Sequence, residues 1–355
     1  MYLTATNLAH CLISNGLVTA QSIVEGDFTV VEAGRRNRNF KVLRKRAPGL
    51  FVKQIKTSEQ QATFTLRKEA EFYQRVQMNP AFAPIAAMIP AMLRFEPARH
   101  AVFLRLTPDA ESLFEYQLRT NDFGSENAGK LGNALAILHA FGPALAQDPS
   151  LRSTLPGQLP WAMTLDQQGS SVFQNLGPIG TQIATLLQGF PALAPQLCAL
   201  RHEWQFETVI HGDMKWENCL LYPEADGQHG LQIVDWELVD VGDGAWDVAT
   251  IFKEYLVLTI ITADSPQRKT LDDLRPSMRE FWKSYAGGRR FTAEQAARFR
   301  ERAVRFTAAR MLVAVAEYLY GAPQAIVAGT AMLQTAASIL ASPQTASMQM
   351  LGHPA

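Results

Sequence analysis

Two stretches of sequence decide the fold of this chain: HGDMKWEN at residues 211–218 and VDWE at residues 234–237. Between them lie two short apolar runs, separated by the turn-forming segment Pro223–Gly230. This order predicts a polar loop, a β-hairpin and a second polar loop in direct succession. Gly212 favours a tight turn in the first loop, because glycine adopts backbone angles that other residues avoid.

The acidic and amide residues of this block have the spacing of a phosphoryl-transfer site. In protein kinases, an Asp of the catalytic loop accepts the proton of the substrate hydroxyl, and an Asn five residues later binds metal. Asp213 and Asn218 have this spacing, and Asp235 follows the next strand as the second metal ligand. Lys215 is placed to contact the transferring phosphate. Taken singly, Asp213 and Asn218 could be turn formers and Asp235 could cap a helix, but their joint order is hard to obtain by chance.

The block also resembles the aminoglycoside phosphotransferase and choline kinase-like family, distant relatives of the protein kinases. That family has HGDxxxxN, a hydrophobic strand, DWE and then a GD…D segment, which is Gly242–Asp247 here. The resemblance implies an α+β, bilobal protein-kinase-like fold, with a small β-rich N-lobe and a large helical C-lobe. It implies a nucleoside triphosphate, ATP or GTP, and Mg²⁺ as cofactors. It also implies that His211 and Asp247 support the catalytic loop.

A second motif of the family, LGxxLxxLH, matches the helix predicted at residues 126–141. Leu131, Leu135 and Leu138 fall on one face of that helix, so we expect them to pack in the core. We interpret His139 as a hydrogen-bonded core histidine rather than a catalyst.

The first lobe should supply a lysine for the phosphates and a glutamate that holds this lysine. Lys53 lies on the third predicted strand, and Glu69 on the next helix is the expected partner, whereas Glu71 should face solvent. Asn39 is a further candidate for nucleotide binding. It ends the loop Gly34–Asn39, which lacks the glycine pattern of protein kinases.

The segment around this loop is strongly basic. Attraction to polyphosphate would explain it, but a solvated or partner-binding face remains an equal alternative. The basic residues are Arg35, Arg36, Arg38, Lys41, Arg44, Lys45 and Arg46.

The remaining periodicity predicts the elements and their grouping. Thr4 and Thr19 should start two short helices, and the chain beyond Trp246 should be helical. Strands are expected at 28–31, 40–43, 50–55, 92–96, 101–106, 220–222 and 231–234, and helices at 63–77, 126–141, 180–188 and 195–205. Residues 142–178 should be a long connection. The predicted domains are an N-terminal helical extension (1–27), the N-lobe (28–106), the C-lobe (107–341) and a flexible tail (342–355).

Composition limits the function classes. The chain has 33 Lys plus Arg and 33 Asp plus Glu, so its global charge does not indicate nucleic-acid binding. Its three cysteines are far apart, which favours reduced, buried thiols. The apolar stretch 318–341 is broken at Gly321–Gln324, so we expect buried helices rather than a membrane span. A cytoplasmic protein with no nucleic-acid or membrane partner is predicted.

The acceptor is less clear from the sequence. Between Arg268 and Arg310 there are 12 basic and five acidic residues, which argues against the cationic aminoglycosides and choline of the family. We therefore expect an anionic or peptidic hydroxyl compound, with the Arg298, Arg302 and Arg305 cluster as its contact.

Two alternatives remain open. RNFKV at 38–42, VKQ at 52–54 and HGDxxWxN resemble bacterial kinases that phosphorylate Ser or Thr of a ribosomally synthesised peptide before dehydration. Such an enzyme would have a partner in a peptide-modification pathway. From another class, the chain could be a pseudokinase that binds nucleotide or a partner without chemistry, although Lys53, Asp213 and Asp235 are all present.

Overall fold

The computed structural model describes residues 2–34, 37–55, 60–168 and 171–352. The chain divides into two compact units: unit 1 comprises Met1–Tyr116 and Glu217–Val239, and unit 2 comprises Gln117–Trp216 and Asp240–Ala355. The structure thus assigns residues 217–239 to the N-terminal part, whereas the predicted boundary placed them in the C-lobe.

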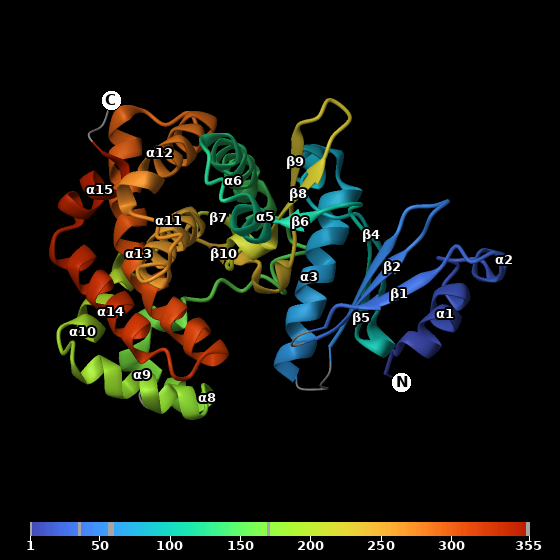
Figure 1. The fold of residues 1–355 in the computed structure, drawn as a ribbon, viewed down its shortest axis with the longest axis horizontal. Coiled ribbons are helices and arrows are strands. Elements are labelled where there is room, and N and C mark those ends of the chain that lie inside the picture. The colour runs from blue at the N-terminus through green and yellow to red at the C-terminus, as the bar shows by residue number, and fades with distance from the viewer. Residues whose placement is uncertain (1, 35–36, 56–59, 169–170, 353–355) are drawn as a thin grey trace. The chain divides into compact units, whose positions relative to one another are not determined.

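Unit 1 is built on a five-stranded antiparallel sheet with the strand order β1-β2-β3-β5-β4 (Figure 1). Phe40 and Val42 of β2 are buried while Lys41 and Leu43 between and after them are exposed, as expected for a strand with one covered face. The strands are β1 (Thr29–Glu32), β2 (Arg38–Leu43), β3 (Leu50–Gln54), β4 (Met92–Glu96) and β5 (Ala101–Arg105).

Two short helices precede this sheet and share its core. α1 (Ala5–Ser14) and α2 (Ala20–Val24) begin after Thr4 and Thr19, whose side chains accept hydrogen bonds from the backbone of the first turn, as predicted. Buried α1 side chains pack with buried residues of β2, β3 and β5 in one hydrophobic cluster. These helices therefore contribute to the hydrophobic core of the sheet.

The rest of unit 1 carries a long helix and a second small sheet. In that sheet β6 pairs with β8, and β8 with β9. The Ile233 amide also donates to the Met88 carbonyl, which explains why the hairpin belongs to this unit. The elements are α3 (Gln60–Met78), the short helices η1 (Pro80–Phe82), α4 (Ala83–Ala86) and η2 (Pro97–Arg99), β6 (Glu111–Ser112), β8 (Cys219–Pro223), β9 (His229–Ile233) and η6 (Trp236–Leu238). α5 (Leu113–Thr120) and η5 (Trp216–Asn218) carry the chain across the unit boundaries.

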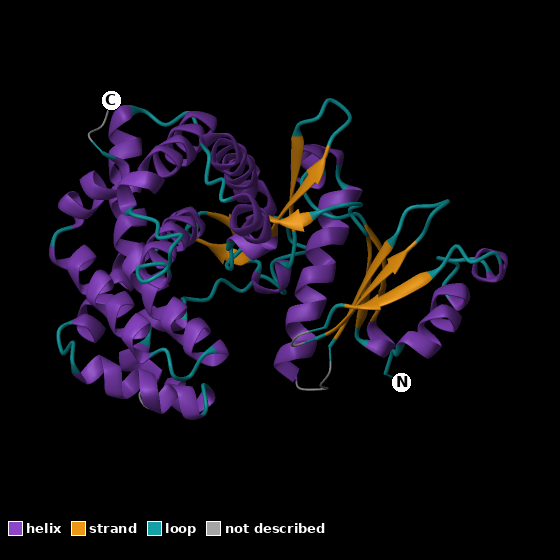
Figure 2. Cartoon of the chain, viewed as in Figure 1, coloured by secondary structure: helices purple, strands orange, loops and turns teal. Residues whose placement is uncertain are grey.

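The regular structure in the described part of unit 2 is helical apart from the short antiparallel pair β7–β10 (Figure 2). α6 packs against α12, and α11 against α13. Gly132 of the LGxxLxxLH motif allows the first contact, because a Cβ there would lie 2.4 Å from the Phe281 carbonyl oxygen. The elements are α6 (Ser125–Ala146), η3 (Trp161–Met163), α7 (Leu165–Gln168), α8 (Ser171–Asn175), α9 (Pro178–Gln188), α10 (Leu193–Ala199), η4 (Leu200–Glu203), β7 (Thr208–Ile210), β10 (Asp240–Gly242), α11 (Gly244–Ile261), α12 (Leu271–Gly288), α13 (Ala293–Gly321), α14 (Ile326–Ala341) and α15 (Pro343–Leu351).

The predicted flexible tail is wrong for residues 343–351, which form α15. Met350 and Leu351 of this helix are buried. The Nε atoms of Arg275 and Arg279, on α12, donate to the carbonyls of Gln349 and Leu351. Arginines thus satisfy carbonyls that a helix C-terminus leaves without partners.

Other parts of the chain differ less from expectation. The predicted long connection at 142–178 contains the short helices η3, α7 and α8, and α6 extends into it as far as Ala146. The three cysteines are buried and free, as expected. Within the described ranges, no single helix is long and apolar enough to span a membrane, and two sharply bent helix pairs reach that length only together.

Candidate active site

The HGD loop lies in unit 2 and is held by the carboxylate of Asp247 on α11. Asp247 Oδ2 accepts a hydrogen bond from the His211 amide at 2.7 Å, and Oδ1 accepts one from the Gly212 amide at 3.0 Å. Gly212 has a φ of 82°, in the left-handed region that glycine adopts without strain. One buried side chain therefore fixes two consecutive amides just before Asp213.

His139 supports Asp247 from α6, and both side chains are completely buried. His139 Nε2 lies 3.2 Å from Asp247 Oδ2, and Nδ1 lies 2.9 Å from the Tyr285 hydroxyl. Burial lowers the pKa of His139 despite the neighbouring Asp247 carboxylate, so the ring is neutral at pH 7. Burial alone would raise the pKa of Asp247, but hydrogen bonds from His139 and the His211 amide outweigh it and lower the pKa.

Asp213 projects from this loop between two cations. Its carboxylate lies 2.8 Å from Lys215 Nζ and 3.4 Å from Arg310 Nη2, and its amide donates to His211 Nδ1 at 3.2 Å. Burial acts to raise the pKa of Asp213, but Lys215 and Arg310 outweigh it and hold the pKa below its ordinary range. The carboxylate is therefore ionised at neutral pH.

Unit 1 holds the other group of predicted residues, centred on Lys53 of β3. Its ammonium contacts three carboxylates, at 2.9 Å from Glu69, 2.5 Å from Asp235 and 3.2 Å from Glu237. Burial lowers the pKa of Lys53, but these carboxylates outweigh it and raise the pKa well above its usual value. Burial raises the pKa of Glu69 to about 7.

The backbone around Asp235 explains how this cluster forms. Asp235 has a φ of 66°, a left-handed conformation that costs about 1 kcal/mol in a residue with a Cβ. The next amide, of Trp236, donates to Glu69 Oε1 at 3.2 Å, and the Trp236 ring stacks on Phe72 of α3 with ring centroids 4.4 Å apart. Strained backbone of this kind is concentrated at functional sites.

The two predicted asparagines also lie in unit 1. The Asn218 carbonyl accepts a hydrogen bond from the Val234 amide at 2.9 Å, which joins the start of the hairpin to the residue before Asp235. Asn39 pairs with Lys53 across β2 and β3, so the two side chains lie on the same face of the sheet. Asn39 Oδ1 is buried and has no hydrogen-bond partner among the described residues.

The cluster around Lys53 fits a metal-assisted nucleotide site. The side chain of Asp235 is 39% exposed and offers oxygen ligands, which Mg²⁺ prefers. Across the described ranges, no group of three or more His, Cys, Asp or Glu side chains forms a complete metal site. Mg²⁺ is often bound by one or two carboxylates together with substrate phosphates, so the Asp235 carboxylate fits the predicted cofactor.

Arginines of the basic segment around Gly34–Asn39 contact the N-terminal part of unit 1. Arg38 lies over the Tyr2 ring and donates to the Leu3 carbonyl, while Arg44 and Arg46 pair with Asp27 and Glu25. Three of its arginines therefore contact residues that flank α1 and α2, which weakens the polyphosphate interpretation. Arg35 and Arg36 lie outside the described residues.

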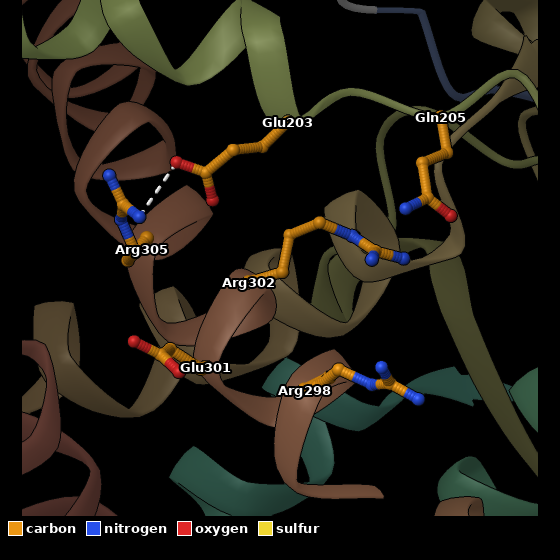
Figure 3. Close-up of a pocket in the computed structure, with 6 residues that line it drawn as sticks. All are labelled: Glu203, Gln205, Arg298, Glu301, Arg302 and Arg305. Atoms are coloured by element: carbon orange, nitrogen blue, oxygen red, sulfur yellow. Dashed lines mark ion pairs between the residues drawn. The ribbon is translucent and has the colours of Figure 1, made fainter. Parts of the chain in front are cut away.

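The predicted arginine cluster lines a cavity of about 320 Å³ in unit 2 (Figure 3). Arg305 faces Glu203 at 2.7 Å, Arg302 lies 2.8 Å from Asp243, and Arg298 lies 3.5 Å from Glu294. Asp243 is wholly buried and caps α11 through the Ala245 amide. Two of these carboxylates lie outside the stretch 268–310, so counting charges within it overstated its excess of positive charge.

Two residues of the clusters were not identified from the sequence. Glu237 belongs to the quoted VDWE motif, and its acidic side chain two residues after Asp235 was a usable signal. Arg310 was counted only as one basic residue among many. Nothing in the sequence marks its contact with Asp213, which lies 97 positions away.

The sequence pattern of the phosphotransferase enzyme family matches residues 27–281. Among curated proteins, none matches this chain.

Solved structures share the fold at low identity. The choline kinase LicA from Streptococcus pneumoniae is 14% identical, with 93% of this chain and 99% of that chain covered and a TM-score of 0.54. Aminoglycoside 2'-phosphotransferase-IIIa is also 14% identical, with coverage of 95% and 99% and a TM-score of 0.58. The amicoumacin kinase hAmiN is 10% identical, with coverage of 93% and 96% and a TM-score of 0.55. The predicted α+β, kinase-like fold is thereby confirmed, and the chain belongs to the phosphotransferase enzyme family.

Proposed function

We propose that this enzyme transfers the γ-phosphoryl group of ATP or GTP to a hydroxyl group of a small molecule, with Asp213 as the catalytic base. The observation that carries the proposal is the HGD loop, in which Asp247 fixes two amides so that an ionised Asp213 stands beside Lys215. Family membership supplies the reaction class.

Asp213 would orient the acceptor hydroxyl and accept its proton. The low pKa of Asp213 makes it a weak base, so proton transfer would come late, when the bond to phosphorus is forming. A largely dissociative transition state needs little deprotonation of the acceptor beforehand. Lys215, whose side chain is 28% exposed, would turn from Asp213 to the transferring phosphate and neutralise its charge.

Unit 1 would hold the nucleotide. Lys53 would contact its α- and β-phosphates while Glu69 keeps the ammonium in place. Asp235 and Asn218 would bind Mg²⁺, which supplies neutralisation of the phosphate charge. Asn39 lies beside Lys53 on the same sheet face and would contact the nucleotide.

Structures of the same fold support a nucleotide and a divalent cation as cofactors. They leave the choice between ATP and GTP open. Aminoglycoside 2'-phosphotransferase-IIIa was solved with GDP. The amicoumacin kinase was solved with AMP-PNP, Ca²⁺ and its substrate. Both nucleotides therefore remain candidates here, and a divalent cation is expected.

The structure gives no support for the expectation that the acceptor is anionic. The acceptor is therefore a hydroxyl compound whose charge we leave unassigned. The arginines that argued for an anionic acceptor are paired with carboxylates, so the cluster around Arg302 offers little net attraction. Phosphorylation of a ribosomally synthesised peptide stays an alternative, supported by sequence resemblance alone. A pseudokinase is disfavoured because Asp213 is ionised and held in a fixed loop.

The test is Asp213→Asn in an assay of ATP and GTP consumption against aminoglycosides, choline, macrolides and Ser/Thr peptides. The wild-type enzyme should turn over one of these acceptors. The variant should do so about a hundredfold or more slowly, because the proton acceptor and the orientation of the acceptor hydroxyl are lost together. Nucleotide affinity, measured by calorimetry, should stay within about twofold, because Asp213 does not hold the nucleotide in the proposed mechanism. Turnover near the wild-type value would refute the assignment.

A further inference from the structure

Arg310 on α13 is a buried cation at the catalytic loop. Only 3% of its side chain is exposed, and Nη2 lies 3.4 Å from Asp213 Oδ1. Its guanidinium lies 5.0 Å from the centroid of the Trp246 ring, which is within the range of a cation–π interaction. A buried charge is costly unless it is paired, so these two contacts mark Arg310 as a fixed part of the loop's surroundings.

The Trp246 ring links Arg310 to the backbone of the loop. Trp246 Nε1 donates to the Gly212 carbonyl at 3.2 Å, while the neighbouring Asp247 accepts from the Gly212 amide. The glycine before Asp213 is thus held at both its amide and its carbonyl by consecutive residues of α11. Arg310 adds a contact that reaches the Asp213 carboxylate from α13, outside the loop.

Lys215 and Arg310 differ in burial, and this difference separates their roles. Lys215 lies on the same loop as Asp213 with 28% of its side chain exposed, and its four-carbon stem can change conformation. Arg310 is stacked on Trp246 and almost wholly buried, so it stays in place. When Lys215 moves to the phosphate in the proposed mechanism, Arg310 still contacts the Asp213 carboxylate.

We propose that Arg310 is a positioning residue, which keeps the Asp213 carboxylate in its reactive orientation after Lys215 has turned to the transferring phosphate. This inference rests on the proposed function of Asp213. It also gives Arg310 a charge-dependent effect on Asp213, because the Lys215 and Arg310 cations both lower the pKa of Asp213. The other titratable groups of the loop's surroundings are His211 on the loop, Asp247 on α11 and His139 on α6.

The experiment compares Arg310→Met, Arg310→Gln and Arg310→Lys in the full chain. Asp213 is followed by ¹³C NMR of its carboxyl carbon over pH, with Asp213→Asn to assign the signal. The Met and Gln variants should raise the pKa of Asp213 toward its ordinary range, and Lys should keep it low. With MgATP and the acceptor from the screen, kcat should fall about tenfold in the Met and Gln variants, with KM for MgATP unchanged and an acidic limb appearing in the pH profile.

Lys253→Met is the matched control, since Lys253 is a buried cation of the same unit that pairs with Glu254. It should leave the titration of Asp213 unchanged. The inference is overturned if Asp213 titrates alike in wild type and the Met or Gln variant, or if Lys253→Met moves it equally. If one neutral variant fails to fold, the other carries the same comparison. Because NMR reads Asp213 without turnover, an inactive wild-type enzyme would refute the proposed function and leave the titration result standing.

Discussion

Unit 1 and unit 2 each hold a cluster of ions, and the two clusters have opposite signs. In unit 1, three carboxylates surround the single ammonium of Lys53, which leaves a formal charge of −2 when all are ionised. In unit 2, Lys215 and Arg310 flank the single carboxylate of Asp213, which leaves +1. Carboxylates are in excess in the first cluster and cations in the second.

In the proposed mechanism, this difference separates two electrostatic tasks. An excess of carboxylates attracts a divalent cation, and Lys53 keeps those carboxylates from repelling one another when no cation is bound. An excess of cations keeps Asp213 ionised and favours negative charge that develops on a transferring phosphate. Each of the following changes removes one charge, either from a cluster or from the carboxylate that holds the HGD loop.

The largest effect is expected from Asp235→Ala, which removes the exposed carboxylate of the unit 1 cluster. Calorimetry of wild-type enzyme should show tight ATP binding only with Mg²⁺. In the variant this dependence should vanish, with affinity for MgATP lower by about a hundredfold, because a metal ligand is lost. Asp226→Ala, in the hairpin turn of the same unit, is the control. Equal wild-type affinity with and without Mg²⁺ would indicate a nucleotide-binding pseudokinase.

Asp247→Asn should have the next largest effect, because it removes the buried charge that holds the catalytic loop. An amide offers one acceptor oxygen where two loop amides need acceptors, so turnover should fall about tenfold or more. The free energy of unfolding at pH 7 should fall by about 2–4 kcal/mol. Urea unfolding measures this, with the exposed Asp272→Asn as control.

The pH dependence of that variant has a defined sign. The folded-state pKa of Asp247 is lowered, so its contribution to stability is fully present above the ordinary pKa of Asp and is lost as the pH falls through the folded value. The stability difference between wild type and Asp247→Asn should therefore shrink below about pH 4. A difference that grows with acidification would contradict the assigned role of this carboxylate.

Glu237→Gln should have the smallest effect. Glu237 is the most distant of the three carboxylates around Lys53. Its replacement should therefore lower the affinity for MgATP by only about threefold. The same calorimetry compares it with Asp235→Ala. A loss of MgATP affinity as large as that of Asp235→Ala would instead indicate that Glu237, like Asp235, binds the metal.

Local patterns in the sequence determined the first helix starts, the hairpin and most of the candidate site residues. The helix starts at Thr4 and Thr19 depend on hydrogen bonds within one turn, and the hairpin between Asn218 and Asp235 depends on apolar runs and a turn. Motif spacing predicts the candidates of the HGD loop and Asp235, but not Glu237 or Arg310. The Lys53–Glu69 pair, predicted from a strand followed by a helix, is present at 2.9 Å.

Contacts between distant segments were decided only by the tertiary structure. The partners of Arg302 and Arg305 lie outside the basic stretch, α15 is fixed by two arginines of α12, and Asp213 meets an arginine 97 positions away. A sequence records which charges a segment carries, but the net charge of a site depends on which carboxylates the fold brings to it. Since Coulomb energy depends on distance and burial, only the folded chain fixes which of its ions act together.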